Sequence, residues 1–165
     1  MSISIRRAQS TDVEWVAELL TGEETEPYLR PQIAEGVPGE VERSQREPQR
    51  FGRFIVEVDG ERAGVMGFEE RSAAHRIARL EGLAIHPDHR GRQVADDGAR
   101  LLQRYLFDEL GYHRLELSCY GFNERAIRHA ERVGFVREGV QRRAYLRHGD
   151  WQDAVLFSLL QEDLR

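Results

Sequence analysis

Residues 83–95 decide how this chain is interpreted, and they read Leu83-Ala84-Ile85-His86-Pro87-Asp88-His89-Arg90-Gly91-Arg92-Gln93-Val94-Ala95. An apolar strand runs here into a basic turn that contains glycine and opens a helix. A helix N-terminus leaves about four backbone amides without partners and carries the positive end of the helix dipole, so it stabilises an anion. Gly91 lets the backbone approach a ligand closely, and Arg90 and Arg92 add positive charge. The stretch predicts a diphosphate-binding loop; the alternative is a basic helix start that happens to contain glycine.

Two common nucleotide-binding loops are absent from the sequence. The P-loop spacing Gly-x-x-x-x-Gly-Lys-Ser/Thr does not occur, and no Gly-x-Gly-x-x-Gly follows a strand in a βαβ unit. The pattern therefore argues against an NTPase and against a dinucleotide-binding enzyme.

Apolar periodicity on both sides of this stretch predicts the remaining elements. Strands are expected at residues 2–8, 54–58, 62–68, 77–85, 115–119, 139–146 and 155–160, and helices after Ser10-Thr11-Asp12 and at residues 90–110 and 124–133. Asp59-Gly60 predicts a type I′ hairpin turn, and His148-Gly149-Asp150 predicts another turn between strands. Residues 21–49, where glutamates alternate with prolines, predict loops and one short helix. The order of elements indicates an α/β sandwich with a mixed sheet.

Composition bounds the class of protein. The chain has 165 residues, 40% hydrophobic and 32% charged, which fits one domain over residues 1–165 and no membrane span. A net charge of −5 argues against nucleic-acid binding, which needs clustered Lys and Arg. The first residues alternate like a strand and lack the apolar stretch of a secretory signal, so we expect a cytoplasmic protein. Cys119 is the one cysteine, and it predicts a free buried thiol rather than a disulfide or a zinc site.

Two motifs give the chain a specific resemblance. Residues 90–95 resemble motif A of the GCN5-related N-acetyltransferases (GNAT superfamily), whose pattern is Arg or Gln, two residues, Gly, one residue, Gly or Ala. Gln93 stands where this family usually has glycine. Residues 123–135 resemble motif B, an Asn-led helix that ends in Gly134-Phe135. Residues 136–154 are similar to the branch that acetylates ribosomal-protein N-termini, spermidine and related amines, and the resemblance covers about residues 50–165.

This resemblance implies a fold, a donor and a set of donor-binding residues. The implied fold is a mixed, mostly antiparallel sheet of about six to seven strands flanked by about four helices. The implied donor is acetyl-CoA, and the acetyl group passes directly to a primary amine without a covalent enzyme intermediate. Residues implied to hold the donor are Leu83, Ala84, Ile85, Arg90, Gly91, Arg92, Gln93, Val94, Ala95 and Asn123. Asn123 also suits the role of helix cap, and the two roles are compatible.

The catalytic residues are less directly implied. Glu81 is the candidate general base, because period-two alternation would place it on one face with Leu83 and Ile85; a solvent-facing or ion-paired glutamate is the alternative. Many relatives use a motif B tyrosine as general acid, but Ala130 stands there. Tyr120, Tyr145 or Ser118 could protonate the leaving thiolate instead, or it could leave unaided.

The acceptor and partners stay open at this stage. A small amine, a polyamine or a protein N-terminus fits an amine acceptor, and the alternative function is a non-catalytic acyl-CoA sensor. The glutamates that could attract a cation are Glu23, Glu24, Glu26, Glu35, Glu40, Glu42 and Glu47, with a merely solvated acidic surface as the alternative. His86, His89 and His113 lack the spacing of zinc ligands, so no metal is expected. Exposed strand edges make a homodimer an expectation.

Overall fold

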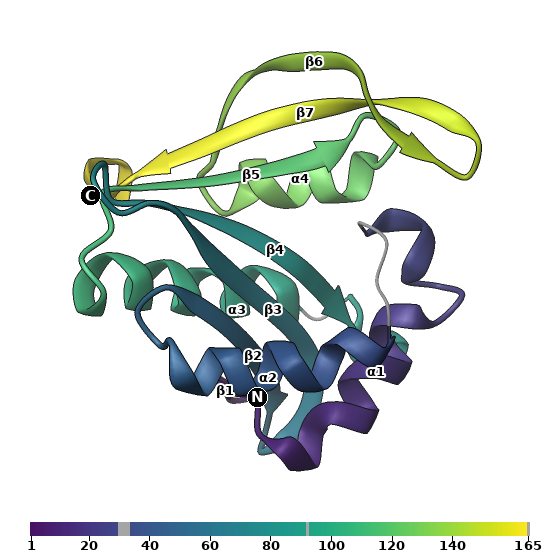
Figure 1. Cartoon of the computed structure of the whole chain (residues 1–165), viewed down its shortest axis with the longest axis vertical. Helices are drawn as coiled ribbons and strands as arrows, with labels where there is room; N and C mark the ends of the chain where they lie inside the picture. The colour runs from purple at the N-terminus through teal and green to yellow at the C-terminus, as the bar shows by residue number, and fades with distance from the viewer. Residues whose placement is uncertain (30–33, 92, 165) are drawn as a thin grey trace.

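One sheet organises the fold in the computed structural model, which describes residues 1–29, 34–91 and 93–164 (Figure 1). Its strands are β1 (Ile3–Arg7), β2 (Phe51–Val58), β3 (Glu61–Ser72), β4 (Ile77–Ile85), β5 (Arg114–Tyr120), β6 (Val136–Arg147) and β7 (Asp150–Leu160). They form a seven-stranded sheet in the order β1-β2-β3-β4-β5-β7-β6. β4 and β5 are parallel, and the other neighbouring pairs are antiparallel. The predicted α/β fold with a mixed, mostly antiparallel sheet is confirmed.

Helices cover both faces of this sheet. The α-helices in the described residues are α1 (Val13–Thr21), α2 (Val37–Arg46), α3 (Val94–Arg104) and α4 (Glu124–Arg132). α1 and α2 pack on one face, against Ile55 and Ala84 among others, and we call this the α1–α2 face. α3 and α4 pack on the other, against a core that includes Phe68 and Phe157, and we call this the α3–α4 face. Two apolar cores, one on each side, therefore hold the sheet.

The predicted hairpins form at the predicted turns. Asp59 and Gly60 have φ of 50° and 84°, and His148 and Gly149 have φ of 49° and 82°. Paired positive φ values are those of a type I′ turn, whose twist matches that of the flanking strands. The sequence signal placed both turns correctly, although the strands extend beyond the predicted limits.

The long helix predicted over residues 90–110 is shorter than expected. The chain forms a 3₁₀ turn at Pro87–His89, α3 begins only at Val94, and a π-helical turn over Tyr105–Glu109 ends it. Gly91 and Gln93 have φ of 79° and 61°, so neither of these two residues can belong to a right-handed helix.

In its described residues, the glutamate-rich segment forms one α-helix between less regular stretches, as predicted. It contains α2 and two short 3₁₀ turns, Glu26–Tyr28 and Ala34–Gly36. In the described residues, no helix is long and apolar enough to cross a membrane. Cys119 is a buried free thiol, and burial raises its pKa to about 11. Its predicted packing role is confirmed.

Candidate active site

The sheet opens between β4 and β5. These parallel strands pair through Ile77–Arg79 and Arg114–Glu116, and beyond these residues they diverge (Figure 1). The second half of β4 still pairs with β3 on its other side, where Val65 lies opposite Ala84 and Gly64 opposite Ile85. Backbone N–H and C=O groups on the free side of β4 can therefore bind a ligand that enters the opening. Leu83, Ala84 and Ile85, the residues predicted to line the donor's arm, all belong to this segment.

A β-bulge in β4 corrects the predicted position of Glu81. Gly82 and Leu83 together oppose Met66, and Gly82 has a φ of 69°. An extra residue reverses the alternation of side chains beyond it. Leu83 and Ile85 consequently pack on the α3–α4 face, whereas the register pairs Glu81 with Gly67, on the α1–α2 face. Glu81 and Leu83 therefore do not share a face. The prediction was wrong on this point because it assumed a regular strand.

Glu81 still lies beside the opening. It comes two residues after Arg79, the last residue of β4 that pairs with β5, and its side chain is partly buried. Leu83 and Ile85, predicted to bind the donor, and Glu81, the candidate base, thus lie on opposite faces of the sheet. This arrangement suits a transfer between two molecules that approach from opposite faces.

The predicted anion loop follows β4 directly. The Arg90 guanidinium donates to the Ile85 carbonyl over 3.1 Å and lies 3.5 Å from a Glu24 carboxylate oxygen. Arg92 lies outside the described residues. Gln93 is the N-cap of α3, and Val94 and Ala95 begin its first turn, where N–H groups lack helical acceptors. The helix N-terminus required for a diphosphate site is therefore present at the end of β4, while Arg90 is engaged within the turn.

The backbone conformation at Gln93 explains why glycine is usual at this position of the motif. Its φ of 61° lies in the left-handed region, which costs a residue with a Cβ about 1–2 kcal/mol. Gln93→Gly is therefore expected to raise the free energy of unfolding by about 0.5–1 kcal/mol, after the greater chain entropy of glycine is deducted. Thermal and urea unfolding measure this. Gln93→Ala keeps a Cβ and should bring no such gain; a Gln93→Gly protein that melts no higher than wild type would contradict the argument.

A charged cluster joins α3 to α4 behind this loop. Asp96, in the first turn of α3, accepts from His129 over 2.7 Å and from Arg132 over 2.8 Å. The hydrogen bond from Arg132 holds the pKa of Asp96 below its usual value. Burial lowers the pKa of His129, although Asp96 opposes this shift. His129 is therefore neutral near pH 7 and donates its Nδ1 proton to Asp96. The cluster fixes α4 against the start of α3.

These shifts predict a loss of stability in mild acid. The unfolded chain protonates His129 near its ordinary pKa of about 6.5, whereas the folded protein does so only at lower pH. Protons then bind preferentially to the unfolded state, so stability should fall as pH drops below about 6.5, by less than about 1.4 kcal/mol per pH unit. The depressed pKa of Asp96 adds a further loss below about pH 4. Urea midpoints at pH 7.5 and 5.5 should differ more for wild type than for His129→Gln; equal differences would refute the assignment.

The two predicted catalytic tyrosines lie together on the upper part of the sheet. Their rings meet edge to face at 5.8 Å, and the Tyr145 hydroxyl lies 3.3 Å from Ser118 Oγ. Ser118 and Tyr120 alternate with Leu117 and Cys119, which pack on the α3–α4 face, so they project from the α1–α2 face. The structure thus brings all three candidate acids, Tyr120, Tyr145 and Ser118, into one cluster on the face that carries Glu81.

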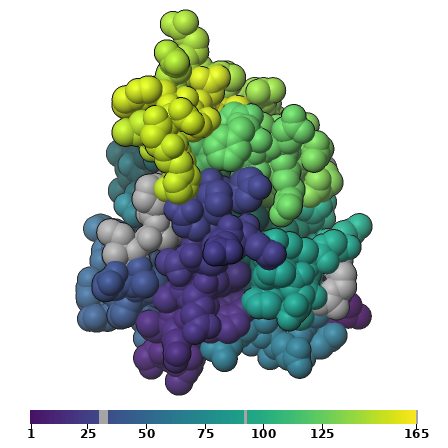
Figure 2. Space-filling model, turned by 90° about the vertical axis from the view of Figure 1, so that its right-hand side faces the viewer, coloured from purple at the N-terminus to yellow at the C-terminus, as the bar shows by residue number. Residues whose placement is uncertain are grey.

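Tyr120 is engaged by the segment between α1 and α2. Its hydroxyl donates to the Leu29 carbonyl over 3.2 Å, and its ring stacks on Phe122. Phe122 also contacts Tyr28, while Glu26 pairs with Arg147. Residues 26–29 therefore lie against the β5–β7 part of the sheet, as Figure 2 shows for this dark blue segment between the yellow hairpin and the green turn. Tyr145 has the freer hydroxyl of the two tyrosines.

Motif B forms the helix that its sequence predicts, with Asn123 at its N-terminus. Asn123 caps α4, and its side chain accepts from the Ala126 amide over 3.2 Å. Ala130 is fully buried in the core of the α3–α4 face. A donor-binding role for Asn123 stays a prediction, and the position of the motif B tyrosine offers no proton donor.

Most of the acidic segment is neutralised within the chain. Carboxylates that pair with arginines are those of Glu24, Glu26, Glu40, Glu42 and Glu47. Among the described residues, no group of three or more His, Cys, Asp or Glu side chains could hold a metal. The glutamates are spread over separate ion pairs rather than gathered in one cation-binding pocket.

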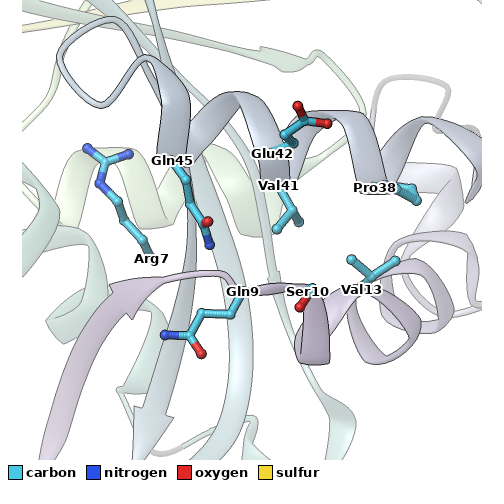
Figure 3. Close-up of a pocket in the computed structure, with 8 residues that line it drawn as sticks. All are labelled: Arg7, Gln9, Ser10, Val13, Pro38, Val41, Glu42 and Gln45. Carbon is cyan, nitrogen blue, oxygen red and sulfur yellow. The ribbon is translucent and has the colours of Figure 1, made fainter.

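A groove between α1 and α2 does not coincide with this site. It has a volume of about 720 Å³, and Val13 and Val41 face each other across it (Figure 3). Arg7 at its end already donates to the carbonyls of Ser44 and Phe51. Among the described residues, none of those predicted to bind the donor or to catalyse transfer lines it, although Glu42, one of the glutamates considered for attracting a cation, does.

Sequence reasoning missed two charged groups. Arg53 is a fully buried arginine on β2. It lies just before residues 54–58, where the apolar pattern predicted this strand, so the pattern assigned it no place in the sheet. The Asp96–His129 contact joins residues 33 apart in the chain, and only helix periodicity in both motifs could have suggested it.

Comparisons with known proteins agree with this geometry. A model of the acetyltransferase (GNAT) family matches residues 14–135. The spermidine N(1)-acetyltransferase of Escherichia coli is 32% identical over 109 residues, which are 66% of this chain and 58% of that protein. The prophage-derived uncharacterized N-acetyltransferase YokL of Bacillus subtilis is 31% identical over 121 residues, 72% of this chain and 67% of that protein. The match to the spermidine enzyme thus spans less than two thirds of its length.

Solved structures extend the likeness over nearly the whole chain. Spermidine N-acetyltransferase from Vibrio cholerae, in complex with CoA and spermine, superposes with a TM-score of 0.86 at 23% identity, covering 99% of this chain and 98% of that one. RimL, a ribosomal-protein alpha-N-acetyltransferase, gives 0.85 at 19% identity over 97% and 91%. Identities this low show a shared fold, whereas the family match rests on the sequence itself. The chain belongs to the acetyltransferase (GNAT) family.

Proposed function

We propose that this protein transfers an acetyl group from acetyl-CoA to a primary amine. The observation that carries the proposal is the opening between β4 and β5, which ends at the N-terminus of α3. An opening lined by free strand groups suits an amide-containing arm, and a helix N-terminus suits a diphosphate. Acetyl-CoA contains both groups in sequence, so the described residues fit this donor.

The proposed chemistry is direct attack. A primary ammonium has a pKa of about 10, so the amine must lose a proton before it attacks the thioester. Glu81 accepts that proton, directly or through water, from the α1–α2 face. The thioester carbonyl lies against β4, whose backbone amides polarise it as the new C–N bond forms and the C–S bond breaks. Tyr145 is the better-placed donor of a proton to the leaving thiolate, because the Tyr120 hydroxyl is bound to Leu29.

The acceptor class is a small amine, a polyamine or a protein N-terminus. Relatives named for spermidine and for a ribosomal protein support this range. Because the acidic segment is largely paired within the chain, we place a singly charged amine or an N-terminus ahead of a long polyamine. The proposed location is the cytoplasm, where acetyl-CoA is available.

A homodimer is part of the proposal. β6 is the outermost strand of the sheet, and it is exposed along most of its length. Val140 on this strand and Trp151 on β7 are large apolar side chains that stay exposed. An uncovered edge of this kind favours pairing with a second copy. Light scattering of the purified protein tests the oligomeric state.

A thiol-release assay tests the activity. Purified protein is mixed with acetyl-CoA and, in turn, spermidine, a monoamine and a peptide with a free N-terminus, and free CoA thiol is followed with time. Calorimetric titration of acetyl-CoA is run in parallel. Release that requires an amine supports the transferase.

Binding without release from any amine would favour the second candidate, an acyl-CoA sensor of the same fold. Ala130 at the usual position of the general acid, and Gln93 in place of glycine, are the observations that favour this candidate. No binding at all would refute both.

A further inference from the structure

Arg53 is a charged residue in the middle of the sheet for which the proposed chemistry has no direct use. It lies on β2 and is 2% exposed. Its Nε and Nη2 donate to one carboxylate oxygen of Glu40 on α2, and its Nη1 has no hydrogen-bond partner. A buried donor without an acceptor costs stability, and an apolar side chain of similar size would avoid that cost. Its presence calls for a role other than stability.

The Arg53 side chain reaches across β3 to the bulge of β4. Arg53, Gly67 and Glu81 lie in one row across three strands. Gly67 has no side chain, so the guanidinium passes over it: a Cβ built there would lie 3.1 Å from Nη1. A Cβ built on Gly82 would collide with the same nitrogen. The guanidinium therefore rests directly against the residue whose left-handed backbone makes the bulge.

The bulge at Gly82 determines which face each site residue uses. With the bulge in place, Glu81 lies on the α1–α2 face while Leu83 and Ile85 lie on the α3–α4 face. If β4 relaxed to regular pairing, side chains beyond Gly82 would exchange faces, since alternation has a period of two. Glu40 anchors the guanidinium from α2, so the contact also connects the helix on the α1–α2 face to the strand at the opening.

We propose that Arg53 is a positioning residue that holds the Gly82 bulge and thereby presents Glu81 and the Leu83–Ile85 backbone on their respective faces. This inference rests on the proposed acetyl transfer for its kinetic consequence. Its structural part concerns the unliganded protein and is tested without turnover.

The test compares Arg53→Met, Arg53→Lys and a matched control, Arg46→Met. Arg46 pairs with Glu42 on the exposed side of α2, far from β4. Amide hydrogen exchange over residues 80–85 is measured without ligand, and kcat and KM are measured with the amine that wild type accepts. Thermal unfolding checks that each variant folds; Arg53→Met should melt within a few degrees of wild type, because Glu40 is 34% exposed and can be hydrated.

Arg53→Met is expected to exchange the 80–85 amides about tenfold faster. Its kcat should fall by about tenfold or more, with KM for acetyl-CoA changing less, because small displacements at the reacting groups act on the chemical step. Arg53→Lys keeps a charge near Glu40 but lacks the planar group over Gly67 and Gly82, so it should behave like Arg53→Met. Arg46→Met should match wild type.

Exchange at the wild-type rate in Arg53→Met would overturn the proposal, as would wild-type exchange and kcat in Arg53→Lys, which would make charge alone responsible. If Arg53→Met does not fold, Arg53→Lys decides by the same criteria. A wild-type protein that releases no CoA would refute the proposed function, whereas faster exchange in the variants would still support the role of Arg53 in the bulge.

Discussion

Replacing Glu81 with glutamine is expected to lower kcat for acetyl transfer by about 100-fold, the usual contribution of a general base. Glutamine has nearly the same size but cannot accept the ammonium proton. Because Glu81 lies on the α1–α2 face and the predicted donor-binding residues Leu83 and Ile85 on the other, the affinity for acetyl-CoA should stay within about twofold. Thiol release gives kcat, and calorimetry gives the dissociation constant.

Glu69→Gln is the matched control for this substitution. Glu69 lies on β3, on the same face two residues beyond Gly67, and it pairs with Arg43 away from the opening. It should keep wild-type kcat. A Glu81→Gln enzyme that turns over at the wild-type rate would remove Glu81 from the mechanism and leave the proton to water or to the tyrosine cluster.

Replacing Ala95 with glutamate is expected to weaken acetyl-CoA binding by about 100-fold, or about 2.7 kcal/mol. Ala95 lies in the first turn of α3, so a carboxylate there would occupy the free amides and repel the diphosphate. The same charge favours a helix N-terminus by about 0.3–1 kcal/mol, so the unliganded protein should melt no lower than wild type. Calorimetry and thermal unfolding measure the two effects, which should have opposite signs.

Gln141→Glu controls for the added charge, since it places one negative charge on β6, far from α3. Ala95 is preferable to Arg90 for this test, because the Arg90 side chain holds the Ile85 carbonyl and its loss would disturb the turn itself. Unchanged affinity in Ala95→Glu would show that the diphosphate binds elsewhere.

Local chemistry in the sequence determined most of the fold. Asp59-Gly60 and His148-Gly149 take left-handed conformations that few other pairs adopt, so they fixed two hairpins. Asn123 and Gly134 marked the ends of α4. The motifs at residues 90–95 and 123–135 indicated the family. These signals depend on residues close together in the chain, which is why one sequence suffices to interpret them.

Tertiary structure alone decided how the site is arranged. Glu81 was assigned to the face of Leu83, but the bulge at Gly82 separates them, and the bulge is in contact with Arg53, a residue 29 positions earlier in the chain. Tyr120 and Tyr145 meet only because β6 and β7 return beside β5. Pairing between distant segments sets register and face, and a single inserted residue reverses the face of every side chain beyond it. Local periodicity carries no information about such an insertion until the neighbouring strands are in place.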